Sequence, residues 1–302
     1  MLNKSHVYAG CLGSLLWLAG SGPAVADHWW PNWGPAVAET AVNTLSSEGC
    51  PIETADGLSL IIASNRDGQL DLWAADRDTI RAPWQAPRKL EAPANSDSND
   101  FCPFPVWGRA LLFVSERADG TGCGVTGGDI YYTRQSPAGG WAEPVNLGCA
   151  PDGPNTPGPE RSPSIVETWY GTFLFYSTNG GSGDNDIYVS RLGRDGFGPG
   201  HVVSSLSSEF EDFMPNIRPR ERGGFEIVFN SNRPSWGPHA ESAMGGQDVY
   251  TSTALFLTGH WSSPVNLGPN VNTSGNETRA TLSGDGKRLH FGRDGDIYVS
   301  ER

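Results

Sequence analysis

The sequence predicts an all-β fold, a five-bladed β-propeller whose last blade is closed by a strand from the N-terminal end. One recurring signature is an apolar run with Ser and often Arg, then a Gly-rich turn and a triplet of Asp, an apolar residue and an aromatic residue. A second signature is an aromatic residue followed by Pro, which recurs between the triplets. Its markers lie 51 to 64 residues apart, at Trp33, Trp84, Trp141, Phe197 and Trp261. This period fits one four-stranded blade per unit.

The triplets give the third strand of each expected blade. They are Asp71-Leu72-Trp73, Asp129-Ile130-Tyr131, Asp186-Ile187-Tyr188, Asp248-Val249-Tyr250 and Asp296-Ile297-Tyr298. The apolar run before each triplet predicts the second strand, and the segment ahead of that run predicts the first. Two Asp-Gly pairs, Asp56-Gly57 and Asp285-Gly286, predict two-residue hairpin turns with positive φ angles between first and second strands.

The order of the signatures predicts how the ring closes. The chain opens with the aromatic-Pro element at Trp33 and ends just after the triplet at Tyr298. We therefore expect Pro31 to Thr40 to supply the outermost strand of blade 5, which leaves no free sheet edge between the first and last blades.

The first 26 residues predict a signal peptide. Lys4 is the early charge, an apolar stretch runs from Leu12 to Ala19, and Ala24-Val25-Ala26 precedes Asp27. The alternative, a lipoprotein anchored at Cys11, lacks an apolar run ahead of the cysteine. We therefore expect residues 27–302 to form one propeller domain that is exported, periplasmic or extracellular.

The composition excludes several classes of partner. The formal net charge is −13, and a chain this acidic repels phosphate backbones and anionic lipid surfaces, which argues against nucleic-acid binding. No stretch beyond the signal peptide reaches the 18 apolar residues of a membrane span. Abundant Gly and Pro fit many short strands joined by turns. We expect a monomer.

The end of the chain resembles a known repeat family. Val265-Asn266-Leu267-Gly268, Ser283-Gly284-Asp285-Gly286-Lys287 and the final triplet are similar to the PD40, or WD40-like, repeats of TolB and of many exported bacterial proteins. The resemblance covers Trp33 to Arg302 and implies a propeller. It implies little about activity, because propellers of this class host binding proteins, peptidase gates and proteins without a known role. Blades 3 and 4 depart from the pattern, because Asn179 stands where Arg appears elsewhere and no Asp-Gly turn follows their first strands.

A carboxylate stands three residues ahead of a Pro, or of Ala280 in the last blade, at the start of each first strand. A fivefold ring would bring these side chains together at the mouth of the central channel. They are Glu48, Asp100, Glu160, Asp212 and Glu277. On the same face we expect the arginines that follow the second strands, namely Arg66, Arg117, Arg233 and Arg293.

Three interpretations of this ring stay open. The first is structural, with each Arg pairing with an acid or with a triplet Asp of its own or the next blade. The second is a ligand or cation site at the channel mouth, where oxygen ligands favour Ca²⁺. The third is a glycosidase that uses two of the acids as general acid and as nucleophile or base. No other cofactor is expected.

The loops that differ between blades predict where a ligand is recognised. Insertions from Ala118 to Gly128 and from Pro234 to Gly246, with the long Ala150–Pro159 loop, are expected on the acid-bearing face. Trp236 and His239 could stack on a sugar or a peptide. We interpret the protein as a non-enzymatic propeller that binds a protein, peptide or glycan through this face. The alternative is a carbohydrate-active hydrolase.

The four cysteines beyond the signal peptide predict two disulfides in an exported chain. Cys50 and Cys102 occupy the same place in consecutive blades, two residues after the acid. Cys123 and Cys149 lie in loops that are expected to emerge side by side. We therefore predict Cys50 paired with Cys102 and Cys123 paired with Cys149, provided that the Cα atoms lie within about 7 Å.

Overall fold

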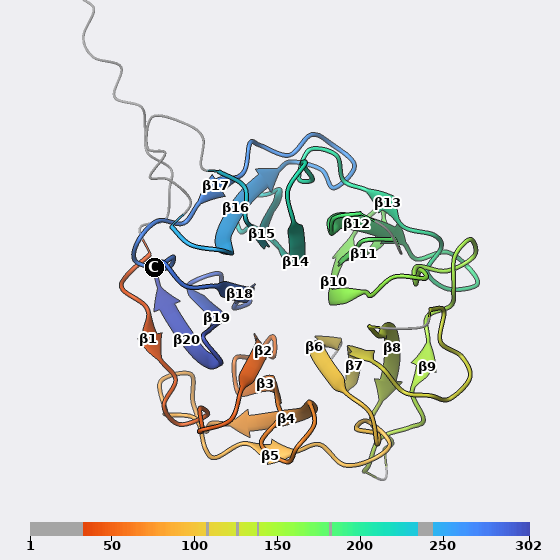
Figure 1. Cartoon of the computed structure of the whole chain (residues 1–302), viewed down its shortest axis with the longest axis horizontal. Helices are drawn as coiled ribbons and strands as arrows, with labels where there is room; N and C mark the ends of the chain where they lie inside the picture. The colour runs from red at the N-terminus through yellow and green to blue at the C-terminus, as the bar shows by residue number, and fades with distance from the viewer. Residues whose placement is uncertain (1–32, 107–108, 125–126, 138, 181–182, 235–243) are drawn as a thin grey trace, which may run out of the picture. The chain divides into compact units, whose positions relative to one another are not determined.

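Five antiparallel four-stranded sheets surround a central axis in the computed structural model (Figure 1). The structure describes residues 33–106, 109–124, 127–137, 139–180, 183–234 and 244–302. The predicted five-bladed β-propeller is confirmed. In the described part of the chain, no helix is long and apolar enough to cross a bilayer. The signal peptide lies outside the described residues and stays a prediction.

Blades 1 to 4 each contribute four strands in chain order from the axis outward (Figure 1). Blade 1 contains β2 (Glu48–Glu53), β3 (Ser59–Ser64), β4 (Asp71–Asp76) and β5 (Arg88–Lys89). Blade 2 contains β6 (Asp100–Val106), β7 (Ala110–Ser115), β8 (Asp129–Arg134) and β9 (Val145–Asn146). Blade 3 contains β10 (Arg161–Thr168), β11 (Gly171–Thr178), β12 (Asp186–Arg191) and β13 (His201–Val202). Blade 4 contains β14 (Asp212–Pro219), β15 (Phe225–Ser231), β16 (Asp248–Ala254) and β17 (Val265–Asn266).

Blade 5 is closed by the N-terminal end of the described chain, as predicted. It contains β18 (Glu277–Leu282), β19 (Arg288–Arg293), β20 (Asp296–Glu301) and, outermost, β1 (Val37–Ala38). Val37 pairs with Val299, and the Gly34 N–H donates to the Glu301 carbonyl at 2.8 Å. Of the predicted closing segment, Pro31 and Asn32 lie outside the described residues.

Apolar side chains between adjacent blades form the core. Phe175 of blade 3 packs in one cluster with Ile217 and Tyr250 of blade 4, and all three are buried. In blade 1 every residue of β3 after Ser59 is buried. Sheets covered on both faces have no solvent side, which explains why the second strands alternate so weakly in sequence.

The hairpin loops at the two Asp-Gly pairs differ from the prediction. The Gly57 N–H donates to the Thr54 carbonyl at 2.8 Å, and Gly57 alone takes a positive φ, of 69°. Asp56 does not; instead its carboxylate accepts from the Thr54 hydroxyl at 2.6 Å. The loop is therefore a turn followed by a glycine in the left-handed region. Gly adopts this backbone conformation without strain because it has no Cβ atom.

Each innermost strand carries a bulge near its start, at the residue two positions after the ring acid. The pairing with the second strand shifts register there, as between Gly49 and Ile52 and between Phe101 and Phe104. A residue with positive φ, between 47° and 56°, stands at this point in each blade: Cys50, Cys102, Ser162, Met214 and Arg279. The bulge re-aims the strand, and it decides which side chains reach the axis.

Candidate functional site

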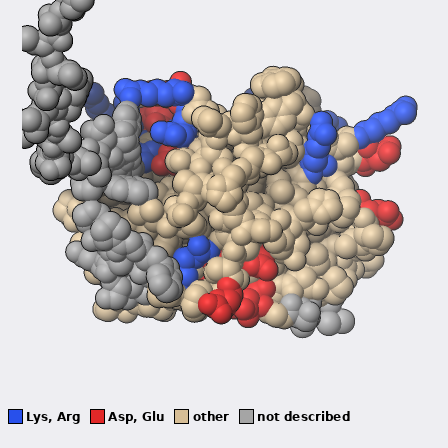
Figure 2. All heavy atoms as spheres, turned by 90° about the horizontal axis from the view of Figure 1, so that it is seen from above, with Lys and Arg blue, Asp and Glu red and all other residues tan. Residues whose placement is uncertain are grey.

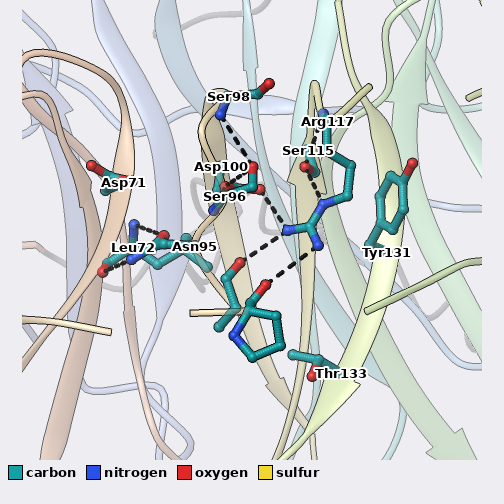
Figure 3. A network of polar contacts seen from close by, with 12 residues as sticks. Asp71, Leu72, Asn95, Ser96, Ser98, Asp100, Ser115, Arg117, Tyr131 and Thr133 are labelled. Atoms are coloured by element: carbon teal, nitrogen blue, oxygen red, sulfur yellow. Dashed lines mark hydrogen bonds and ion pairs between the residues drawn. The ribbon is translucent and has the colours of Figure 1, made fainter. Parts of the chain in front are cut away.

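The five predicted ring carboxylates are buried inside their own blades, with exposed fractions of 0 to 3%. A Ser or Thr hydroxyl four residues earlier donates to each one. In blade 2 the Ser96 hydroxyl donates to Asp100 Oδ2 at 2.7 Å (Figure 3). The preceding Asn95 bonds both backbone groups of Leu72, which anchors the loop to β4. In each blade, three side chains thus hold the loop before the innermost strand in place: an Asn or Ser, a Ser or Thr, and the acid.

An arginine neutralises the carboxylate in four of the five blades. Arg117 Nη2 lies 2.9 Å from Asp100 Oδ1 and also donates to the Ala94 carbonyl at 3.0 Å (Figure 3). Its guanidinium lies 5.1 Å from the centroid of the Tyr131 ring. Equivalent pairs join Arg66 to Glu48, Arg233 to Asp212 and Arg293 to Glu277. The structural interpretation of these four pairs is confirmed.

The expected ring of carboxylates at the channel mouth is therefore wrong. The left-handed residue two positions after each acid lines the axis in its place, whereas the acid accepts bonds from its own loop. The described residues contain no group of three or more His, Cys, Asp and Glu side chains placed to hold a metal ion. The Ca²⁺ interpretation has no converging set of oxygen ligands here.

Blade 3 differs because no arginine of the described residues forms an ion pair with the Glu160 carboxylate; Arg161 Nη1 donates only to the Glu160 backbone carbonyl, at 2.8 Å. The backbone position that Arg117 occupies in blade 2 belongs to Gly180, whose N–H donates to the Thr178 hydroxyl at 3.1 Å just as the Arg117 N–H donates to Ser115. The equivalent residue is thus Gly180 and not the predicted Asn179. The carbonyl that an arginine would bind, that of Pro154, accepts instead from the Tyr176 hydroxyl at 2.8 Å.

Glu160 consequently keeps its proton at neutral pH. Burial raises the pKa of its carboxyl to about 8, and the charge of Asp129 adds to the increase against the opposing hydrogen bonds from Thr156. Oε1 accepts from the Thr156 N–H at 2.9 Å and from its hydroxyl at 2.6 Å. Oε2 has no hydrogen-bond partner among the described residues. A protonated carboxyl with a free oxygen is the state that a general acid needs.

A polar pocket opens in blade 2. Its volume is about 390 Å³, and Arg117, Asp129 and Tyr131 line it together with glycines of the 118–128 loop. Glu160 does not itself line the pocket and is fully buried, but its N–H donates to the carbonyl of the lining residue Gly128 at 3.1 Å. Asp129 Oδ2 is held by the Cys123 N–H at 2.7 Å and by the Asn146 side-chain amide at 2.8 Å.

The predicted cysteine pairs have opposite outcomes. Cys123 and Cys149 form a disulfide with a Cα–Cα distance of 5.3 Å, which confirms that pair and ties the 118–128 loop beside the pocket. The predicted bridge between Cys50 and Cys102 is wrong, because both thiols are free and buried. Both lie on bulges that turn them into the channel, where Arg279 interacts with the Cys50 thiol. Trp236 and His239 lie outside the described residues.

Three residues at this site were not singled out from the sequence. Asp129 and Tyr131 were assigned to the repeated triplet, and Tyr176 was assigned to an apolar strand. A signal for Tyr176 was present, because the blade that lacks the Arg is also the one whose second strand carries a Tyr. For Asp129 the signal was the glycine-rich insertion directly before it, which leaves room for a ligand.

No family model and no curated protein matches this sequence. Solved structures do share its fold. The α-L-arabinofuranosidase PaAbf62A from Podospora anserina, in complex with cellotriose, superposes with a TM-score of 0.57 at 13% identity, covering 90% of this chain and 97% of that one. An endo-arabinase from Bacteroides thetaiotaomicron gives 0.53 at 13% identity over the same shares of the two chains.

A third neighbour, an N-acetylgalactosamine deacetylase from F. plautii in complex with blood group B trisaccharide, gives a TM-score of 0.55 at 10% identity, covering 90% and 94%. At such identities these likenesses establish the fold alone. They nevertheless contradict the interpretation as a non-enzymatic binding protein, because the propellers found are carbohydrate-active enzymes. The alternative interpretation, a carbohydrate-active hydrolase, is better supported than the interpretation as a binding protein. The PD40 resemblance stays a prediction.

Proposed function

We propose that this protein is an exported carbohydrate-active hydrolase in which Glu160 is the general acid and Asp129 is the second carboxylate. The observation that carries the proposal is the departure of blade 3 from the repeat. Four ring acids are neutralised by arginine, and the fifth, Glu160, is left protonated with a free oxygen. A residue that performed only the repeated structural task would keep the repeated partner.

The chemistry of glycoside cleavage fits this pair of acids. Such enzymes need one carboxylic acid to protonate the leaving oxygen and one carboxylate to act as nucleophile or base. Glu160, with a pKa of about 8, supplies the first at neutral pH. Asp129 lines the pocket, where Arg117 and the Tyr131 ring offer donors and an aromatic surface to sugar hydroxyls.

The surface supports a neutral polymer as substrate. Figure 2 shows one side of the molecule, on which Lys and Arg lie near Asp and Glu and do not merge into one continuous patch of either sign. The enzymes that share the fold act, by their names, on arabinofuranosides and arabinan. We therefore propose an arabinose-containing polysaccharide as substrate. Export is supported by the Cys123–Cys149 disulfide.

The direct test is hydrolysis of a panel of arabinan, arabinoxylan and galactan by the mature chain. We expect one polymer to release reducing sugar. Glu160→Gln should lower the rate by roughly 10²-fold to 10⁴-fold, the usual contribution of a general acid. Glu277→Gln is the matched control, because Glu277 holds the same place in blade 5 but pairs with Arg293. Its rate per folded molecule should stay near that of the wild type. Absence of product from every polymer, or full activity in Glu160→Gln, would contradict the proposal.

A further inference from the structure

The axis of the propeller narrows to a small cavity that the five innermost strands share. Its volume is about 20 Å³, enough for one water-sized body. The five bulge residues all contribute to its wall: Cys50, Cys102, Ser162, Met214 and Arg279. The cavity is too small for a sugar ring, and none of its lining residues lines the pocket of blade 2.

Two thiols meet in this cavity. The Cys50 and Cys102 side chains interact with each other and have exposed fractions of 4% and 2%. Their strands, β2 and β6, are neighbours around the axis (Figure 1). The Ser162 hydroxyl lies 3.5 Å from Cys102 Sγ. Met214 lines the same cavity, so sulfur-containing residues of three blades contribute to its wall.

A positive charge accompanies the thiols. The Arg279 guanidinium interacts with the Cys50 thiol and lies 5.8 Å from the centroid of the Phe101 ring. Among the described residues no carboxylate pairs with Arg279, whereas the arginines of the outer ring each have one. A partly buried arginine that lines this cavity without an acid partner implies that sulfur supplies the neighbouring negative charge.

We propose that Cys50 and Cys102 form a binding site for one soft monovalent metal cation, Cu(I) in a cell. Thiolate and thioether sulfur are the ligands that select Cu(I). The cavity has the size of an ion. Two thiolates with one monovalent cation carry a net charge of −1, which the guanidinium of Arg279 neutralises.

Other uses of this thiol pair fit the structure less well. A structural Zn²⁺ takes four protein ligands, and the described part of the chain has no cluster of three His, Cys, Asp or Glu side chains. Exchange with the disulfide of another protein requires an accessible sulfur, and both sulfurs are almost fully buried. The site is independent of the proposed hydrolase activity.

The test uses Ag(I), which has the same charge and softness as Cu(I) and does not change oxidation state. Native mass spectrometry of the mature chain with its Cys123–Cys149 disulfide intact should detect one Ag(I) per molecule, and a silver–thiolate absorption band should saturate at one equivalent. Cys50→Ser and Cys102→Ser should each weaken binding at least tenfold. Met214→Leu, which keeps the volume, should weaken it less.

The matched control is the double variant Cys123→Ser with Cys149→Ser, which removes the bonded pair and should still bind one Ag(I). Should the single variants fail to fold, the wild-type band and a rise in its melting temperature with Ag(I) decide the matter. The proposal is overturned if the wild type binds no Ag(I), or if the double variant of Cys50 and Cys102 binds as tightly. A Cys50–Cys102 bridge in the protein as secreted would also overturn it.

Discussion

At the scale of single residues, the buried arginine–carboxylate pairs hold the loops on one face of the propeller. Arg117 donates to Asp100, to the Ser115 hydroxyl and to the Ala94 carbonyl, so one guanidinium fixes the strand end and the loop together. Removing one partner of such a pair leaves an uncompensated buried charge, which costs more than the intact pair contributes. Glu160 has no such partner, and its substitution should therefore behave differently.

Glu277→Gln and Glu160→Gln should change stability in opposite directions at pH 7. The first leaves Arg293 without its carboxylate and should lower the free energy of unfolding by about 3 kcal/mol. The second replaces a neutral acid by a neutral amide and should raise it. Urea unfolding followed by tryptophan fluorescence measures both, and equal losses in the two variants would mean that Glu160 is an ordinary ring acid.

The pH dependence of stability follows from the same residue. The folded pKa of Glu160, about 8, lies above its ordinary value of 4.5. The folded state therefore holds a proton that the unfolded state has released between these values. The contribution is fully present below pH 4.5 and is lost as the pH rises through 8. The unfolding free energy of the wild type, relative to Glu160→Gln, should fall by up to roughly 5 kcal/mol over this window. A flat difference would exclude the raised pKa.

At the scale of elements, the N-terminal strand and the last residue of the chain hold the ring closed. β1 covers the outer edge of β20. Arg302 then reaches across to Glu226 of blade 4, with two bonds of 2.8 Å, and its guanidinium lies 4.6 Å from the centroid of the Trp33 ring. Contacts from both ends of the described chain thus hold blade 5 in place.

Deletion of residues 27–40 should remove β1 from blade 5. It should also remove Trp33 and expose the core residues that pack against it. We expect a fall in melting temperature of well over the few degrees that a frayed terminus costs, together with a tendency to aggregate through the exposed edge of β20. Deletion of residues 27–32 alone is the control and should have little effect. If both deletions leave the melting temperature unchanged, closure by β1 does not stabilise the ring.

The Cys123–Cys149 disulfide joins two loops of the same face. Replacing both residues by Ser should reduce stability by roughly 3 kcal/mol, because the unfolded chain regains the freedom of the loop between them. It should also loosen the wall of the pocket, since the Cys123 N–H holds Asp129. Calorimetry gives the first effect and polysaccharide hydrolysis the second. Unchanged activity would show that the pocket does not depend on this tether.

At the scale of the whole molecule, the repeat in the sequence predicted the number of blades, the order of strands and the closure. Each of these follows from spacing and from turn chemistry, which are visible along the chain. The acids of the ring were also located correctly at the starts of the innermost strands. Their pairing with Arg was one of the interpretations that the residue types allowed, and the structure selects it.

The direction of side chains could not be predicted, because it depends on backbone angles. The positive φ of Cys50 and Cys102 is unusual for residues other than Gly, Asn and Asp, so nothing in their identity signals a bulge. That bulge turns the thiols to the axis and leaves the acids inside the blades. The residue of blade 3 that is equivalent to Arg117 is likewise one position away from the predicted Asn179, at Gly180.

The central claim is that Glu160 is the ring acid that stays protonated at neutral pH. Its most direct test is a pH titration of the side-chain carboxyl carbons of the ¹³C-glutamate-labelled protein, with the Glu160 signal assigned by its absence in Glu160→Gln. We expect a midpoint near 8 for Glu160. A midpoint at the ordinary value near 4.5 would contradict it.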